Sequence, residues 1–275
     1  MKNIFYIFLE LILVGFFMAC NPITEDGSSA EIITVDQFEA TVTPVQLDGK
    51  NTNMVLCETS SPVTCHWTDG VKTYVGNSVE MTLFVTGQQT ITVTAMNQDG
   101  STFTKDYTIT VEDMAYEVDP QYGYFCGTGT KVWTWKSEKC FGNGSNAESG
   151  PAWWVLNPSD VTDQCTAKGF TADGSGAYMT FTLKGLEMTK TSADGTKTSG
   201  TFSFDMSTNT ANGWSYGIGV LTLSNTNILC GHDLNDADYS AWSSYNIVSL
   251  DDETMVLGAQ EFDGDGWWYW VFKAE

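Results

Sequence analysis

Apolar and polar positions alternate along many short segments of this chain, and the last of them, residues 266–273, is the richest in aromatic residues. In a β-strand, successive side chains lie on opposite faces. One face of this segment is wholly apolar and predicts core: Trp268, Trp270 and Phe272. The other face includes Trp267 and Tyr269 and ends in Lys273, so we expect it to meet water or a ligand. The alternative is that a second layer covers it, because large aromatic side chains are usually buried.

The alternating segments form two groups along the chain. Between residues 30 and 113, runs such as 90–95 and 107–111 are separated by turn residues, including the hairpin signal Asp99-Gly100. About 80 residues of this kind match the size of an immunoglobulin-like sandwich.

The second group, residues 120–275, follows a charged connector, residues 112–120, that ends in an Asp-Pro boundary signal. We expect strands at residues 131–136, 177–184, 186–191, 201–206, 218–223, 245–250, 254–259 and 267–273. No convincing helix is expected. The predicted fold class is therefore all-β, an immunoglobulin-like sandwich followed by a larger two-sheet β-sandwich of the jelly-roll type.

The charge of the chain argues against some partners. Its 12 basic residues are all lysine and oppose 34 acidic residues, which gives a net charge of −22. Nucleic acid and anionic membrane surfaces are poor partners for such a field. The lack of arginine also removes the usual bidentate clamp for phosphate or carboxylate groups. A neutral ligand suits this composition best.

Residues 1–20 have the pattern of an export signal. Lys2 supplies a positive start, and residues 4–18 form an apolar run that is short for a membrane span. The run ends in Phe17-Met18-Ala19-Cys20, which resembles the end of a bacterial lipoprotein signal. The resemblance implies that Cys20 carries a lipid and becomes the first residue of the mature chain.

Residues 21–29 are polar and rich in helix and strand breakers, which is typical of a tether. The acidic pair Glu25-Asp26 in this tether resembles the surface-export signal of Bacteroidetes lipoproteins. Together the two resemblances imply a lipid-anchored protein of the outer membrane, exposed at the cell surface.

The first domain carries motifs of a known family. Trp67-Thr68-Asp69-Gly70 is followed by residues 85–95 and by the turn at residues 97–100. This order resembles a PKD-type domain, in which a Trp-x-(Phe)-Gly-Asp-Gly motif precedes a Gly-x-Tyr-x-Val-x-Leu-x-Val strand and an Asn/Asp-Gly turn. The first motif is incomplete here, and Thr90 stands where the family has tyrosine. The resemblance implies an immunoglobulin-like spacer without chemistry of its own.

Six of the seven cysteines remain once Cys20 is lipidated. In an exported chain they could pair, and Cys57 with Cys65 is the natural local pair in the first domain. Four cysteines of the second domain allow three connectivities, among which the sequence does not decide: Cys126, Cys140, Cys165 and Cys230. No Cys-x-x-Cys occurs, so a zinc ribbon or a thioredoxin-type site is not expected.

Hydrolysis of a glycosidic bond needs two carboxyl groups about 5–9.5 Å apart. Asp251 with Glu253, and Asp263 with Asp265, have suitable spacing, but both pairs lie in turns, where aspartate is common for local reasons. Further acids on separate strands or loops are Glu138, Glu148, Asp205 and Glu261. Charged residues are mostly solvated, so we assign no catalytic residue and keep a glycoside hydrolase as the alternative.

Two further motifs are weak. Gly231-His232-Asp233 contains a His-Asp pair but has no nucleophile elbow to complete a triad. Residues 233–238 place oxygen ligands at alternate positions, as calcium loops do, yet lack the glycine and closing glutamate of an EF-hand. Residues 263–266 form a comparable acidic turn. No cofactor is expected beyond a structural calcium at one of these loops, and an ordinary loop is the stronger expectation.

Tryptophan is concentrated in the second domain, which holds nine of the ten. Pyranose rings stack their flat C–H faces on aromatic planes and need polar neighbours for their hydroxyls. Besides Trp267 and Tyr269, the predicted ligand-binding side chains are Trp153, Trp154, Trp214, Tyr216 and Trp242. These five lie in Gly/Asn/Ser-rich loops, where binding groups are common.

The second domain, with its final Gly-Trp-Trp-Tyr-Trp-Val-Phe run, resembles the C-terminal domains of Bacteroidetes surface glycan-binding lipoproteins of polysaccharide-uptake systems. The leading hypothesis is therefore a non-enzymatic surface lipoprotein that binds a neutral polysaccharide or oligosaccharide and works with an outer-membrane glycan transporter. The alternatives are a glycoside hydrolase on the same sandwich and a purely adhesive module whose tryptophans are all buried.

The lipid anchor can be tested by one substitution. If Cys20 carries the lipid, Cys20→Ala moves the protein from the membrane fraction to the soluble fraction of an expressing bacterium, as followed by immunoblot. Membrane association of Cys20→Ala equal to that of the wild type would contradict the lipoprotein assignment.

Overall fold

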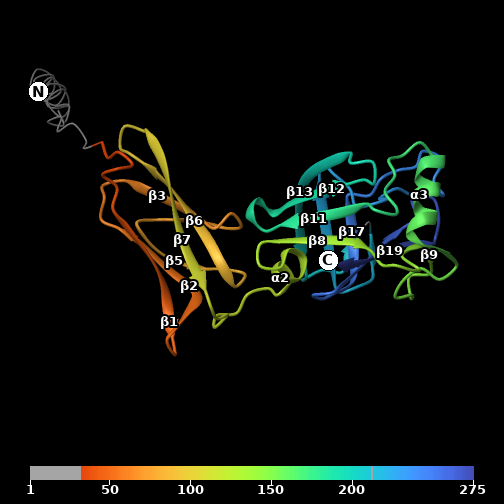
Figure 1. Ribbon diagram of the computed structural model, residues 1–275, viewed down its shortest axis with the longest axis horizontal. Helices are drawn as coiled ribbons and strands as arrows, with labels where there is room; N and C mark the ends of the chain where they lie inside the picture. The colour runs from red at the N-terminus through yellow and green to blue at the C-terminus, as the bar shows by residue number, and fades with distance from the viewer. Residues whose placement is uncertain (1–31, 212) are drawn as a thin grey trace, which may run out of the picture.

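The computed structural model describes residues 32–211 and 213–275, which form two β domains joined by a short connector (Figure 1). The predicted signal segment, the tether and Cys20 lie outside the described residues. Within the described ranges, no helix is long and apolar enough to cross a membrane.

The first domain is a sandwich of two antiparallel sheets. Its strands are β1 (Ala40–Leu47), β2 (Lys50–Thr59), β3 (Thr64–Thr68), β4 (Thr73–Val75), β5 (Ser78–Thr82), β6 (Gly87–Met96) and β7 (Thr102–Val111). One sheet has the order β1-β2-β5 and the other the order β4-β3-β6-β7. Trp67 is fully buried between them, and its indole nitrogen donates to the carbonyl of Gly76 at 2.9 Å. The predicted immunoglobulin-like sandwich is confirmed.

The second domain is one antiparallel sheet that closes on itself. Its ring consists of β8 (Thr130–Trp135), β11 (Tyr178–Thr182), β12 (Glu187–Thr191), β13 (Lys197–Asp205), β16 (Gly219–Ser224), β17 (Ser244–Leu250), β18 (Thr254–Gln260) and β19 (Trp267–Ala274). Each of these strands pairs with the next one in this order, and β19 pairs back with β8. The domain is therefore an up-and-down β-barrel.

The all-β class is confirmed, but the barrel replaces the predicted jelly roll. A jelly roll consists of two sheets joined by Greek-key connections, whereas here neighbours in the ring follow each other along the chain. Alternation along a strand identifies its two faces and not its distant partner. The closing pairs, such as Phe272 with Trp135 and Ala274 with Trp133, join the two ends of the domain.

Strand β19 holds the barrel closed. One of its edges pairs with β18, and the other pairs with β9 (Phe141–Gly144) along its first half and with β8 along its second half. As predicted, its apolar face lies in the barrel core, with every ring fully buried: Trp268, Trp270 and Phe272. An eight-stranded barrel has an interior that side chains of this size fill.

The opposite face of β19 is also buried, which corrects the expectation that Trp267 and Tyr269 meet a ligand. Both are 0% exposed. The Trp214 and Tyr216 rings lie edge-on to Trp267, with centroids 6.2 and 5.4 Å away. The Tyr269 hydroxyl donates to the carbonyl of Ser145 at 2.6 Å. A second layer covers this face, as the alternative interpretation held.

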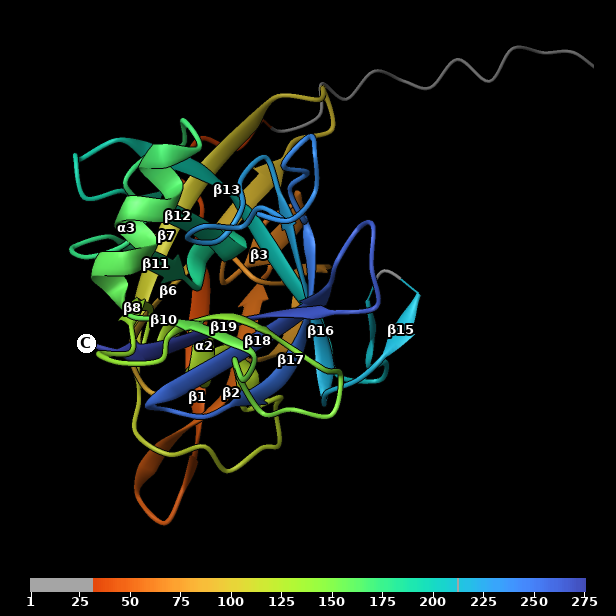
Figure 2. The same ribbon diagram turned by 90° about the vertical axis from the view of Figure 1, so that its right-hand side faces the viewer.

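Glycines beneath the two rings explain why this second layer fits. A Cβ at Gly258 of β18 would lie 3.3 Å from Trp267 and 3.4 Å from Tyr269. Gly144 of β9 pairs with Trp267, and its Cβ would lie 3.5 Å from the Tyr269 ring. The rings therefore lie over glycine positions. The hairpin of β14 (Thr210–Ala211) and β15 (Trp214–Ser215) lies at the side of the barrel beside β16 (Figure 2), and Trp214 from this hairpin packs against Trp267.

Two helices lie at the ends of the barrel, although none was predicted (Figure 1). Helix α2 (Gln121–Cys126) places Phe125 against Phe181 and Phe202, with centroids 5.4 and 5.6 Å away. Helix α3 (Pro158–Ala167) buries Val161 and Cys165 at the other end. Its first turn has a capping box, in which the Asn157 side chain accepts the backbone N–H of Asp160 and the Asp160 side chain accepts that of Asn157.

The two domains pack directly against each other. Phe84 and Val85, which follow β5, belong to the core cluster of the barrel domain. The Phe84 ring lies 4.3 Å from that of Tyr122 on α2, and Gly185 donates its N–H to the carbonyl of Gly70 at 2.8 Å. The first domain is therefore in apolar contact with the barrel as well as covalently connected to it.

Both faces of β19 contribute to stability. Because Trp267 and Trp268 are each fully buried, Trp267→Ala and Trp268→Ala should each lower the free energy of unfolding by about 3–5 kcal/mol in urea titrations. Exposed Trp153 is the matched control, and Trp153→Ala should change the free energy of unfolding by less than about 0.5 kcal/mol. A cost for Trp267→Ala as small as that of the control would contradict the second layer.

Candidate functional site

Three consecutive exposed apolar residues, Trp153, Trp154 and Val155, lie at and just before one outer strand, and we call this segment the aromatic edge. Their exposed fractions are 64%, 38% and 36%. Trp154 and Val155 belong to β10 (Trp154–Leu156), the last strand of the sheet beyond β9. A strand in this position has one edge without a neighbouring strand.

The local backbone fixes the aromatic edge in place. Strand β10 pairs with β9 in the register Trp154 with Asn143 and Val155 with Gly142. The carbonyl of Asn143 accepts the N–H groups of both Ala152 and Trp153 at 2.9 Å. Gly142 has φ +148°, and a Cβ there would lie 1.8 Å from the carbonyl oxygen of Trp154. Only glycine allows the two strands to approach this closely.

Trp154 connects the exposed surface to the barrel core. Its ring lies edge-on to Phe141 at 6.5 Å and to Trp268 at 5.9 Å. Trp268 is fully buried, and its indole nitrogen donates to Asp233 at 2.9 Å. One side of Trp154 is therefore held by the core while the rest meets solvent, which lowers the entropy that a ligand must remove on binding.

A polar cleft of about 320 Å³ adjoins the aromatic edge through Ala152. Its floor includes Val256 and Val271 on the outer face of the barrel, and its rim includes Lys136, Lys139 and Glu148. The described residues place no acidic partner within salt-bridge distance of either lysine. Ammonium and carboxylate groups of this kind can donate to and accept from hydroxyls.

Three other predicted ligand-binding residues do not join this surface. Trp214 and Tyr216 are half-buried and cover Trp267. Trp242 is 3% exposed, donates its indole N–H to the carbonyl of Gln260 at 3.0 Å and packs edge-on against Trp270. The prediction that Trp242 binds a ligand is therefore wrong, because its ring is packed in the core.

Sequence reasoning missed Phe262, which is 48% exposed and stacks on Trp242 at 5.1 Å. The available signal was an aromatic residue inside the acidic turn between β18 and β19. An apolar side chain in such a turn has no local reason to be there, so it indicates a packing or contact role.

Beneath α3, the barrel end holds a buried ion pair. Lys190 points into the barrel from β12, and its Nζ lies 2.8 Å from Oδ2 of Asp173. Asp173 also accepts from the Ser192 hydroxyl at 2.5 Å and from the N–H of Cys230 at 3.1 Å. Lys190 donates further to Asn227 at 2.9 Å. Both charged groups have partners, so the ion pair connects β12 to the loop that carries Asp173 and leaves neither the ammonium nor the carboxylate group free to bind a ligand.

His232 and Asp233 do not form a catalytic pair. The Nδ1 of His232 lies 2.9 Å from the carbonyl of Tyr239, and its ring stacks on Phe170 at 4.2 Å. Asp233 is fully buried and accepts N–H bonds from Asn235, Phe262 and Trp268 at 2.8–2.9 Å. Both side chains hold loops onto the barrel end.

Two of the acids considered for catalysis, Asp251 and Asp205, serve as local acceptors. Oδ1 of Asp251 accepts the N–H groups of Glu253 and Thr254, each at 2.8 Å, and these bonds lower the pKa of Asp251. Bonds from Ser207 likewise lower the pKa of Asp205. A general acid needs a raised pKa, so neither carboxyl group is suited to that role.

Two of the side chains considered as calcium ligands, Asp233 and Asp236, accept hydrogen bonds from backbone N–H groups of the protein. Asp236 accepts the N–H of Ser240 at 2.8 Å, and Asp233 is used as described above. In the parts of the chain that the structure describes, no group of three or more His, Cys, Asp or Glu side chains is arranged to hold a metal ion.

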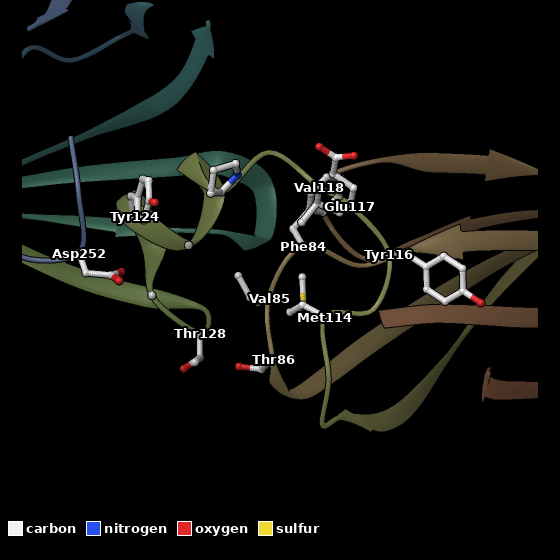
Figure 3. A pocket seen from close by; sticks show the side chains of 13 residues that line it. Phe84, Val85, Thr86, Met114, Tyr116, Glu117, Val118, Tyr124, Thr128 and Asp252 are labelled. Atoms are coloured by element: carbon white, nitrogen blue, oxygen red, sulfur yellow. The ribbon is translucent and has the colours of Figure 1, made fainter. Parts of the chain in front are cut away.

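A second cavity, of about 490 Å³, lies at the junction of the two domains (Figure 3). Val85 and Met114 lie in the middle of its lining, with Tyr124 on the barrel side. No cationic residue lines it. The connector that forms one wall is fixed, because Asn53 accepts from the N–H of Tyr116 at 2.9 Å and donates to its carbonyl at 2.8 Å.

The solved structures similar to this chain include two PKD1 domains. One is the PKD1 domain of the Vibrio cholerae metalloprotease PrtV, 17% identical, covering 27% of this chain and 94% of that domain with a TM-score of 0.23. The other is the PKD1 domain of Vibrio anguillarum Epp, 17% identical, covering 28% of this chain and 92% of that domain, also with a TM-score of 0.23. No family model and no curated protein matches the chain. The immunoglobulin-like assignment rests on the two sheets themselves.

Burial of His232 makes the stability of the barrel end depend on pH. Burial is the main cause that lowers the pKa of His232, so the unfolded chain binds a proton more readily than the folded one. The stability that neutral, buried His232 contributes is fully present above the ordinary histidine pKa of about 6.5, and it decreases as the pH falls below that value.

We therefore expect the melting temperature of the wild type to fall more steeply between pH 7.5 and 5.5 than that of His232→Gln. His66→Gln, at the other histidine of the chain, which is exposed, is the control and should keep the wild-type slope. Equal slopes for the wild type and His232→Gln in differential scanning fluorimetry would contradict this assignment.

Proposed function

We propose that the protein binds a neutral polysaccharide or oligosaccharide through the aromatic edge and the adjoining cleft. The single observation that supports this most strongly is Trp153, which leaves 64% of a large aromatic surface in water. Burying such a side chain would stabilise the fold by a few kcal/mol. Its exposure beside a second tryptophan gives up that stabilisation at one place on the barrel.

The chemistry of the surface suits a sugar. An exposed indole offers a flat face for the C–H side of a pyranose ring, and the cleft offers donors and acceptors for its hydroxyls. Lys136, Lys139 and Glu148 supply both kinds of group within one cleft. The net charge of −22 disfavours strongly acidic ligands at long range.

Binding without catalysis is supported by the state of two of the carboxyl groups considered for hydrolysis. The pKa of Asp205 and that of Asp251 are both lowered by hydrogen bonds, whereas hydrolysis needs one carboxyl group that holds its proton. A glycoside hydrolase is therefore the weaker proposal.

The setting that we propose is the outer face of the outer membrane. Cys20 would carry the lipid, the tether would extend from it, and the first domain would act as a PKD-like spacer that holds the barrel away from the lipid. The proposed partner is an outer-membrane glycan transporter that receives the bound sugar. Contact between Phe84 and Tyr122 would make spacer and barrel move together.

The proposal is tested by affinity electrophoresis of the wild type in gels containing soluble β-glucan, xylan, galactomannan or starch. Trp153→Ala should weaken binding of whichever polysaccharide retards the wild type by about 1–3 kcal/mol, or roughly 5- to 150-fold. Its melting temperature should stay nearly unchanged, because 64% of the Trp153 surface is exposed to solvent.

Ile218→Ala is the control, because Ile218 is a 50% exposed apolar residue that lies outside the aromatic edge. It should bind as the wild type does. The aromatic edge would be refuted if the polysaccharide retarded Trp153→Ala as strongly as the wild type and no longer retarded Tyr124→Ala. That result would place the site in the cavity at the domain junction.

A further inference from the structure

Of the four cysteines in the barrel domain, Cys165 and Cys230 are the pair whose sulfur atoms are in contact. Their Sγ atoms lie 2.9 Å apart, and both residues are buried. They are 65 residues apart in the chain. Cys165 is on the buried side of α3, one turn after Val161, and Cys230 is in the loop that follows β16. This contact selects among the three connectivities that the sequence leaves open.

Both cysteines are held in place by their backbones. The N–H of Cys230 donates to Asp173 at 3.1 Å, and its carbonyl accepts from the indole of Trp270 at 3.2 Å. The carbonyl of Cys165 accepts the N–H of Phe170 at 2.9 Å at the end of the helix. The two sulfur atoms therefore face each other because of the fold around them, and not because of a flexible loop.

We propose that Cys165 and Cys230 form a structural disulfide that fastens α3 to the barrel end when the protein folds in an oxidising compartment. The step is thiol–disulfide exchange with a small or protein disulfide. The thiolate of one cysteine attacks that disulfide and forms a mixed disulfide, and the second cysteine displaces the partner sulfur. The protein loses two hydrogen atoms as the sulfur–sulfur bond forms, and the exchange partner is reduced to two thiols.

The other two cysteines of the barrel domain remain thiols in this arrangement. Cys140 directs its sulfur to the carbonyl of Leu156 at 3.5 Å. Cys126 ends α2, at the end of the barrel opposite α3 (Figure 1). Burial raises the pKa of each to about 12, so each is protonated and unreactive in the folded protein.

The environment of the pair also determines when the bond forms. The hydrogen bond between the thiols of Cys230 and Cys165, together with burial, raises the pKa of Cys230, and a protonated, enclosed thiol attacks disulfides slowly. Oxidation should therefore proceed while the chain folds, before α3 covers Cys230. Once formed, the bond closes a long loop of the unfolded chain and stabilises the fold mainly for that reason.

The test is peptide mapping after refolding. The reduced, unfolded chain is diluted into a mixture of reduced and oxidised glutathione, and recovery of the β-sheet signal is checked by circular dichroism. Free thiols are then alkylated in denaturant, and the digest is analysed by mass spectrometry. We expect one cross-linked peptide pair containing Cys165 and Cys230, with Cys126 and Cys140 alkylated.

Substitutions separate a specific bond from general oxidation. Cys165→Ser should leave Cys230 alkylated, whereas Cys126→Ser should keep the cross-link. Reductant should lower the melting temperature of the refolded wild type by roughly 4–16 °C and leave that of Cys165→Ser unchanged. Alkylation of both Cys165 and Cys230 in refolded protein, or their linkage to other cysteines, would overturn the proposal. None of these results depends on sugar binding.

Discussion

The structure depends on the pairing of β19 along both of its edges and the burial of both of its faces. Strand β18 binds one edge, and β9 and β8 share the other. Inside, Trp268 and Trp270 fill the barrel, and outside, Trp267 lies under Trp214 and Tyr216. Because large aromatic rings bury about 150–250 Å² each, this one strand supplies much of the core and also closes the ring.

That constraint determines which aromatic side chains of this region reach solvent. The interior side chains of β19 are packed in the core and its outer face is covered, whereas Trp153 and Trp154 reach solvent at and just before β10, in the extension that β19 supports through β9. Trp154 touches Phe141 and Trp268, so the aromatic edge rests on the same core that closes the barrel. Helix α3 follows β10 directly, and a bond between Cys165 and Cys230 would fasten this extension to the barrel from the other side.

Each of the eight segments predicted as strands after residue 120 corresponds to a strand of the ring, because alternation is a local property that survives in a barrel. Closure was not predictable, since it depends on pairing between β8 and β19 at the two ends of the domain. Helix α3 was missed because it buries only Val161 and Cys165, too few for a helical period, although Asn157-Pro158 followed by Asp160 was a readable start signal. Exposure of Trp153 followed from its loop position, whereas burial of Trp267 depends on Gly258 in a neighbouring strand.

The central claim is that a closed, filled barrel binds its ligand on the outside, at the aromatic edge. Hydrogen–deuterium exchange, measured with and without a polysaccharide that retards the protein in gels, tests this claim directly. The account predicts that β19 amides exchange among the slowest in both conditions, and that the polysaccharide slows exchange at residues 145–156. Ligand-dependent slowing confined to residues 114–128 at the domain junction, or fast exchange along β19, would contradict it.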